Sequence, residues 1–141
     1  MNLGRLVLAG LAATLAYYAY GFLVFGLLIA EDYAPYAEVY RHGDAITKLM
    51  PLGMAGTFIA ALALTVMYTR GQWGSTALAG GARLGVLVGI VMVTVHVLGN
   101  YVSLNIGGVL ALEQAAAVFV QWTIVCIVVA VVYRPALSES R

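Results

Sequence analysis

The run LGVLVGIVMVTVHVLGNYVSLNIGGVLAL, Leu84–Leu112, decides the fold of this chain. It covers 29 residues between Arg83 and Glu113 and is interrupted only by His96. A helix needs about 20 apolar residues to cross the hydrocarbon of a bilayer. The Gly107-Gly108 pair near its end predicts a tight turn. The run therefore predicts one membrane span, a turn and the start of an antiparallel neighbour.

Three further runs lack Asp, Glu, Lys, Arg and His, with lengths of 25, 21 and 20 residues: Leu6–Ala30, Leu49–Thr69 and Gln114–Tyr133. Only 9% of the chain is charged, against about a quarter in soluble domains. Backbone amides in lipid cannot bond to water, so such runs must be helical. We predict an all-α polytopic membrane protein, a single-domain bundle of four transmembrane helices. Its approximate spans are 5–30, 49–69, 83–105 and 109–133.

Arginine placement predicts the orientation of the four spans. One side holds five basic residues, and the other side holds only Arg41 and Lys48. Basic residues gather on the cytoplasmic side of membrane proteins, so we expect both termini to be cytoplasmic and the chain to be a multi-pass protein of the cell membrane. The first run exceeds the 7–15 residues typical of a signal peptide, so we expect it to stay as a span. The five residues are Arg5, Arg70, Arg83, Arg134 and Arg141.

Residues 31–48 form the one sizeable outer segment. Pro35 is tolerated in the first turn of a helix, so a short interfacial helix is predicted to begin there. Tyr36, Val39 and Tyr40 would share one face at headgroup depth. An aromatic lid over a binding site is the alternative. Asp44 is predicted to cap the second span.

Small and polar residues form a stripe on the third span. At about 100° per residue they fall on one face of the helix. Glycines let a neighbouring backbone come close, and polar groups avoid lipid, so this edge should face other protein. We expect the third span to be the central, most buried helix. Gly53 and Gly56 give the second span a similar packing face. The stripe comprises Gly81, Gly85, Gly89, His96, Asn100 and Ser103.

The last span offers matching polar groups. At about 1.5 Å per residue, Asn100 comes level with Glu113 or Gln114, and His96 comes near Gln121. Cross-helix hydrogen bonds are predicted for both pairs, and a tyrosine of the first span can join them. These residues form a predicted polar seam for ligand or proton handling: His96, Asn100, Gln121, Glu113, Gln114, Tyr17 and Tyr18.

The chemistry of His96 stays open among three interpretations. It is a neutral imidazole bonded to a neighbour, a group that handles protons or solutes, or a ligand of haem or a pigment. Haem held by two histidines would need a second membrane histidine, and His42 lies in the outer segment. No metal site is predicted, because no ligand set at suitable spacing accompanies His96. No cofactor is predicted.

Glu113 likewise has two interpretations. A carboxylate at the start of the last span interacts favourably with the helix dipole, or it captures a cation or proton at the rim of the seam. No catalytic residue is predicted, since no GxSxG, HExxH or phosphate-binding loop occurs. A lone cysteine, Cys126, excludes an intramolecular disulfide. A net charge of +1 argues against nucleic acid as a partner.

Two segments, MPLGMAGTFIAALALTVMY (Met50–Tyr68) and GARLGVLVGIVMVTVHVLGNY (Gly81–Tyr101), resemble small bacterial four-span membrane protein families to which no activity is assigned. The resemblance covers about a third of the chain. It implies the four-span fold and carries no activity or site residue with it.

Three functional hypotheses follow. The glycine stripe and the lack of catalytic residues favour a non-enzymatic membrane protein that self-associates or serves as an accessory subunit of a larger membrane complex. The alternative is a small transporter or lipophilic-ligand-binding protein that uses the seam, which predicts a cavity reaching His96. The third is haem or pigment binding through His96.

Overall fold

The computed structural model describes residues 2–41 and 43–133, and all its regular elements are helical. Four helices are long and apolar enough to cross a membrane, which confirms the predicted fold class: Leu3–Leu28, Asp44–Arg70, Ala77–Ser103 and Gly108–Tyr133. The side on which the termini lie stays a prediction. His42, Arg134 and Arg141 lie outside the described residues, as does the tail between the two arginines.

Two of the four spans change their winding part of the way along. The first consists of α1 (Leu3–Leu23) and a π-helical turn, η1 (Val24–Leu28). The third consists of α3 (Ala77–Met92), a second π-helical turn, η3 (Val93–Val97), and α4 (Leu98–Ser103). The other two spans are uninterrupted α-helices, α2 (Asp44–Arg70) and α5 (Gly108–Tyr133).

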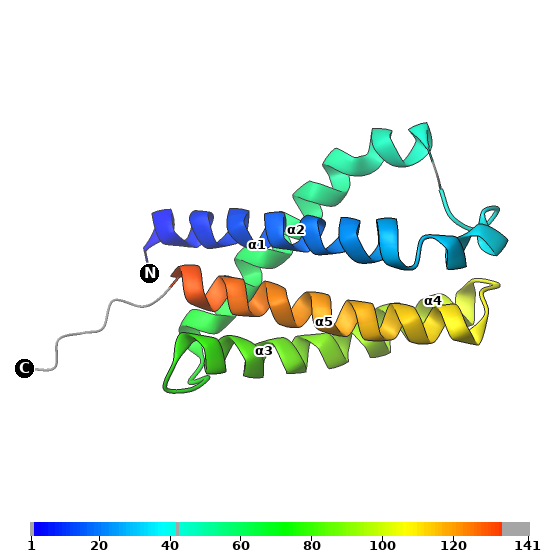
Figure 1. Cartoon of the computed structure of the whole chain (residues 1–141). Helices are drawn as coiled ribbons and strands as arrows, with labels where there is room; N and C mark the ends of the chain where they lie inside the picture. The colour runs from blue at the N-terminus through cyan, green and yellow to red at the C-terminus, as the bar shows by residue number, and fades with distance from the viewer. Residues whose placement is uncertain (1, 42, 134–141) are drawn as a thin grey trace, which may run out of the picture.

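The spans α1 and α5 and the third span run side by side, whereas α2 crosses them at a steep angle (Figure 1). We call the end with residues 29–41 and 104–107 the hairpin end. The opposite end, with Asn2, the 71–76 loop and Tyr133, is the terminal end. There the backbone N–H of Asn2 donates to the Tyr133 hydroxyl at 3.3 Å, which ties the first span to the last.

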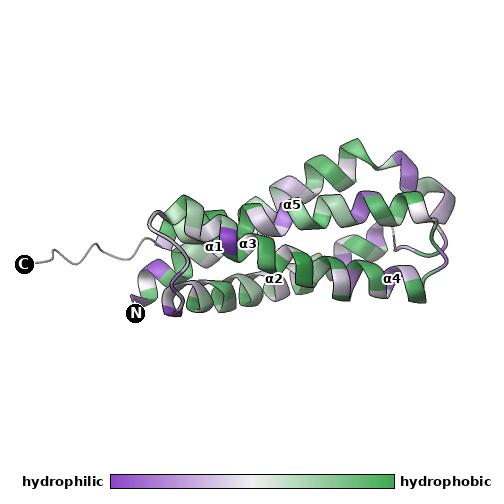
Figure 2. Ribbon diagram, turned by 90° about the horizontal axis from the view of Figure 1, so that it is seen from below, coloured by the Kyte–Doolittle hydropathy of each residue, from purple (hydrophilic) through white to green (hydrophobic). Residues whose placement is uncertain are grey.

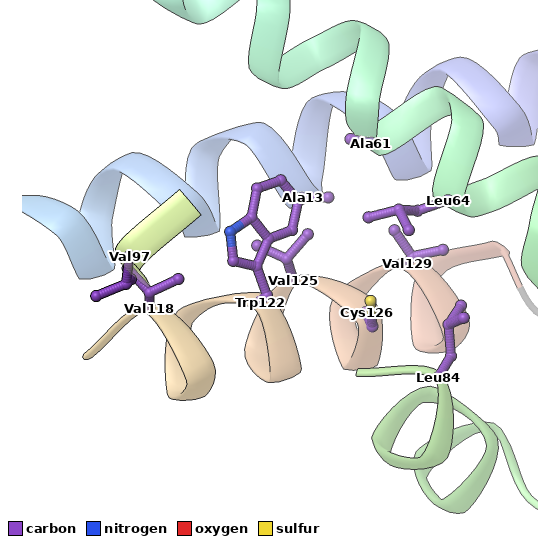
Figure 3. Packing of buried hydrophobic residues seen from close by; sticks show 10 residues of the cluster. All are labelled: Ala13, Ala61, Leu64, Leu84, Val97, Val118, Trp122, Val125, Cys126 and Val129. Carbon is purple, nitrogen blue, oxygen red and sulfur yellow. The ribbon is translucent and has the colours of Figure 1, made fainter. Parts of the chain in front are cut away.

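The central helix is α5. Eleven of its 26 residues are buried, against five in α3 and one in η3. The expectation that the third span is the central helix is therefore wrong. The physical reason is that α5 contacts α1, α2 and α3 and is apolar nearly all round, so it can bury several faces, whereas the third span buries one. Figure 3 shows the buried cluster gathered along α5.

The three glycines of α3 lie against the backbone of α5. A Cβ on Gly81 would lie 2.7 Å from Ile127 Cα, and one on Gly85 would lie 2.7 Å from Thr123 Cα. A Cβ on Gly89 would lie 2.8 Å from the Phe119 ring. No side chain fits at such distances, so the glycines set how closely the two helices pack. This face is covered within one chain and no longer argues for self-association.

The first half of α2 stands apart from the bundle. Residues 44–56 are all exposed, and the buried residues of α2 are Ala61, Leu64 and Thr65. A Cβ on Gly56 would meet open space, and one on Gly53 would meet only the Tyr18 hydroxyl. The predicted packing face at Gly53 and Gly56 is thus not formed among the described residues. Because α2 crosses the other spans at a steep angle, its first half lies away from them. Figure 2 shows apolar residues along this helix.

The π-helical turn η3 changes which residues face inward on the third span. A π turn bonds i to i+5 and so adds about one residue to the helical repeat. A straight α-helix would carry the buried face from Gly89 to His96. Instead Val97, the next residue, is buried at 2% exposure and His96 is exposed. The predicted stripe therefore divides at η3 into a buried glycine part and a part in which His96 and Asn100 line a cavity, while Ser103 is exposed.

The segment after the first span contains a 3-10 helix, η2 (Glu31–Tyr36), with Pro35 near its end. The predicted helix was to begin at Pro35, so the observed one lies further towards the N-terminus. Gly43, and not Asp44, occupies the N-cap of α2, and Asp44 lies in the first turn. Tyr40 turns towards α5 while Tyr36 and Val39 line a separate groove, so the three residues do not share one face.

Candidate ligand cavity

A cavity of about 270 Å³ lies at the hairpin end, between the first span, the third span and α5. Among the described residues, none from α2 lines it, in keeping with the departure of that helix. Its wall combines three kinds of side chain. The polar ones are His96, Asn100, Gln114 and Gln121; the aromatic ones are Tyr17, Phe25, Tyr33, Tyr40 and Trp122; the aliphatic ones are Met92, Val97 and Val118.

Gln114 ties the segment after the first span to α5. Its Nε2 lies 3.0 Å from the Tyr33 hydroxyl and 3.0 Å from the Tyr40 hydroxyl, and it donates to both. The two rings pack edge to face, with centroids 5.1 Å apart. The pair lines one side of the cavity, whereas Tyr36 and Val39 of the predicted lid line a separate groove, and the lid stays a prediction.

Several neighbouring groups influence the pKa of the Tyr33 hydroxyl in this contact. Burial is the largest influence and raises the pKa of its hydroxyl above the ordinary value near 10. The Gln114 hydrogen bond lowers that pKa, whereas the nearby Tyr40 and Glu113 raise it. The neutral hydroxyl is thus the favoured form, and it can accept from Gln114 while keeping its own proton to donate.

Gln121 crosses from α5 to the first span. Its Nε2 donates to the backbone carbonyl of Tyr17 at 2.9 Å. A Cβ on Gly21 would lie 3.2 Å from this nitrogen, so the glycine leaves room for the approach. A carbonyl can only accept, so the amide must present its nitrogen here and leave Oε1 as an acceptor. The Tyr17 ring in turn lies 5.5 Å from Trp122, centroid to centroid.

His96 and Asn100 make no side-chain hydrogen bond within the part of the chain that the structure describes. The predicted pairs of Asn100 with Gln114 and of His96 with Gln121 are therefore not formed there. Both amides bond instead to the first span and to the segment that follows it. The turn η3 also rotates His96 from the centre of the predicted stripe. The imidazole is left at the edge of the cavity.

Glu113 has an unpartnered oxygen. Its Oε2 is enclosed and has no hydrogen-bond partner among the described residues. Glu113 is the sixth residue of α5, which begins at Gly108 without an acidic residue in its first turn. The dipole interaction falls off within the first turn, so it does not account for a carboxylate at this place. The side chain lies close enough to Tyr33 to influence the pKa of that hydroxyl.

Five of the seven residues predicted to form the seam line the cavity: His96, Asn100, Gln114, Gln121 and Tyr17. Tyr18 packs against Tyr17 at 5.3 Å between ring centroids and directs its hydroxyl towards Gly53. Sequence reasoning missed Tyr33, Phe25 and Trp122. The position of Trp122 next to Gln121 was an available signal, whereas nothing in the sequence indicates that Tyr33 folds back onto α5.

The two π-helical turns flank the cavity. Phe25 of η1 and His96 and Val97 of η3 line it from opposite spans. Such turns occur mostly as single π-bulges inside α-helices and often mark functional sites. Neither turn contains proline, whereas Gly26 lies within η1.

No group of three or more His, Cys, Asp or Glu side chains comes together among the described residues to hold a metal ion. No family model, no curated protein and no solved structure matches this chain. The resemblance to small bacterial four-span families stays a prediction.

Proposed function

We propose that this protein binds a small amphipathic molecule within the membrane, as a ligand-binding protein or small transporter. The observation that carries the proposal is the cavity at the hairpin end, which joins four polar side chains to five aromatic rings. Ligand sites in proteins are mostly apolar or aromatic with a few polar groups that orient the ligand. The composition of this wall follows that pattern.

The size of the cavity limits the ligand. Pockets for drug-sized molecules measure about 300–1,000 Å³, and this one is slightly smaller at about 270 Å³. A single ring with a short polar or charged head fits such a volume. The glycine face, which motivated self-association, is covered by α5, and so ligand binding is the better supported of the two hypotheses.

Trp122 provides a direct test, because its ring lines the cavity and the chain has only two tryptophans. In a Trp73→Phe background Trp122 is the sole reporter. The protein in lipid nanodiscs is titrated with three probes that share a benzyl group: benzyltrimethylammonium, neopentylbenzene and phenylmethanesulfonate. We expect a saturable change in Trp122 emission with at least one of them.

A matched pair of variants identifies the site of binding. Val118 lines the cavity and is 7% exposed, whereas Val120, on the same helix, is 44% exposed. Val118→Phe should abolish the saturable signal and Val120→Phe should retain it, with unchanged helix content by circular dichroism. Asn100→Leu, which adds little volume, should weaken binding if Val118→Phe does not fold. No saturable signal with any probe, or equal signals in the two valine variants, would overturn the proposal.

A further inference from the structure

We infer that the cavity selects a small amphipathic cation, such as an aromatic or alkyl ammonium ion, over neutral and anionic molecules of the same shape. This inference rests on the proposed function and names its ligand class. Three features of the described residues carry it: the arrangement of the aromatic rings, the charges around the wall and the hydrogen-bonding groups left for a ligand.

The aromatic rings come in two packed pairs on different walls. Tyr33 and Tyr40 lie 5.1 Å apart in an edge-to-face arrangement, and Tyr17 and Trp122 lie 5.5 Å apart at a tilt of 59°. Ring faces carry negative charge density and attract ammonium groups within about 6 Å. Both pairs line one small volume, and aromatic rings on different walls are what a cage for an alkylated ammonium ion requires.

Among the described residues the cavity wall carries no fixed positive charge. No Lys or Arg lines it among residues 2–41 and 43–133. Glu113 directly precedes the lining residue Gln114, and its Oε2 is enclosed without a partner in this part of the chain. An enclosed carboxylate oxygen with no compensating group favours a nearby positive charge. It also disfavours an anion, which would lie among the aromatic rings with this carboxylate close to Tyr33 of the same wall.

The carbonyl oxygens of the two glutamine amides favour a positively charged head group. Both glutamine amides already use Nε2: Gln121 donates to the Tyr17 carbonyl, and Gln114 donates to Tyr33 and Tyr40. Their Oε1 atoms are the acceptors that remain, most clearly at Gln121, whose orientation the carbonyl dictates. The partial negative charge of such an oxygen attracts a quaternary ammonium head as well as a primary one and repels an anion.

The three benzyl probes test this inference in the Trp73→Phe background. Benzyltrimethylammonium and neopentylbenzene share one shape and differ by one charge. With each concentration corrected for partition into the nanodisc lipid, we expect the cation to bind about tenfold or more tightly than the neutral probe, and phenylmethanesulfonate to bind most weakly. Equal or tighter binding of neopentylbenzene would overturn the inference and leave the proposed function standing. No saturable binding of any probe would overturn both.

The role of the carboxylate has its own variant and control. Glu113→Gln keeps the shape and should lower the affinity for benzyltrimethylammonium about tenfold without changing that for neopentylbenzene. Glu38→Gln removes the same charge at an exposed position and should change neither. Equal losses in both variants would show a general surface-charge effect and contradict the role of Glu113. If Glu113→Gln does not fold, the order of the three probes still decides the inference.

Discussion

The two ends of the bundle use the same central helix in opposite ways. At the terminal end α5 packs so closely on α3 that Cys126, Val129 and Ala130 have no exposure and Leu84 has 1%. At the hairpin end the same helix presents Gln114 and Gln121 to a cavity. The change occurs beyond Met92, where η3 begins.

The contrast between the two ends shows how one small bundle can combine a closely packed core with a candidate ligand cavity. Closely packed glycines and aliphatic side chains stabilise the terminal end, which can then tolerate a cavity and unpartnered polar groups elsewhere. α2 takes part in the same division, since its buried residues lie in its second half, from Ala61 to Thr65. This division predicts that equal substitutions at the two ends have unequal effects.

The largest effect is expected for a substitution at Gly85, with Gly56 as its control. Gly85→Leu places a side chain where even a Cβ would lie 2.7 Å from the Thr123 Cα, so α3 and α5 must separate. We expect a loss of about 3 kcal/mol in the free energy of unfolding, measured by titrating lipid–detergent micelles with sodium dodecyl sulfate while following helix content.

Gly56→Leu is the matched control, because a Cβ there meets open space. Replacing a helical glycine at such a position should change the unfolding free energy by less than about 1 kcal/mol, in the stabilising direction. Similar losses in the two variants would contradict the division between the packed end and the separated half of α2.

A smaller effect is expected where the two ends meet. Gln121→Leu removes the hydrogen bond of 2.9 Å to the Tyr17 carbonyl, and hydrogen bonds between membrane helices contribute about 0.6–1.7 kcal/mol. We expect a loss of about 1 kcal/mol by the same titration. Thr123→Val is the comparison, since the Thr123 hydroxyl bonds only to Phe119 of its own helix. An equal loss of unfolding free energy in Thr123→Val would show that the hydrogen bond between Gln121 and the first span does not stabilise the bundle.

The smallest effect concerns pH at the hairpin end. Because the pKa of Tyr33 is raised in the folded protein, the unfolded chain releases this proton first as the pH rises. The stability that the protonated Tyr33 hydroxyl contributes is fully present below about pH 10 and is lost as the pH rises through the pKa of the folded protein. The stability of the unmodified protein relative to Tyr33→Phe should therefore fall as the pH rises above about 10. A constant difference over that range would contradict the burial of this hydroxyl.

Much of the fold could be predicted from charge spacing. The uncharged runs correspond to the four long helices, which extend past them at several ends, as α2 does from Asp44. The central helix could not be predicted, because α5 is apolar nearly all round and shows no preferred face. In lipid such a pattern describes a buried helix and a lipid-facing one equally well.

The site could be predicted in part. Polar residues in a membrane helix must face protein or a cavity, and this rule found Gln114, Gln121, Asn100 and His96. It could not find their partners, because positions at about 100° per residue hold only for a straight helix and the third span contains η3. It also could not find Tyr33, whose place depends on how η2 folds back onto α5.

From the sequence alone it follows that four helices are long and apolar enough to cross a membrane and that polar side chains in them favour protein or a cavity over lipid, because both follow from the transfer of side chains and backbone amides out of water. The position of the central helix, the place where α2 leaves the bundle and the residue that η3 turns inward could be known only from the folded chain. Those outcomes depend on close packing between segments far apart in the chain, and van der Waals contacts of that kind leave no periodic pattern in any one helix.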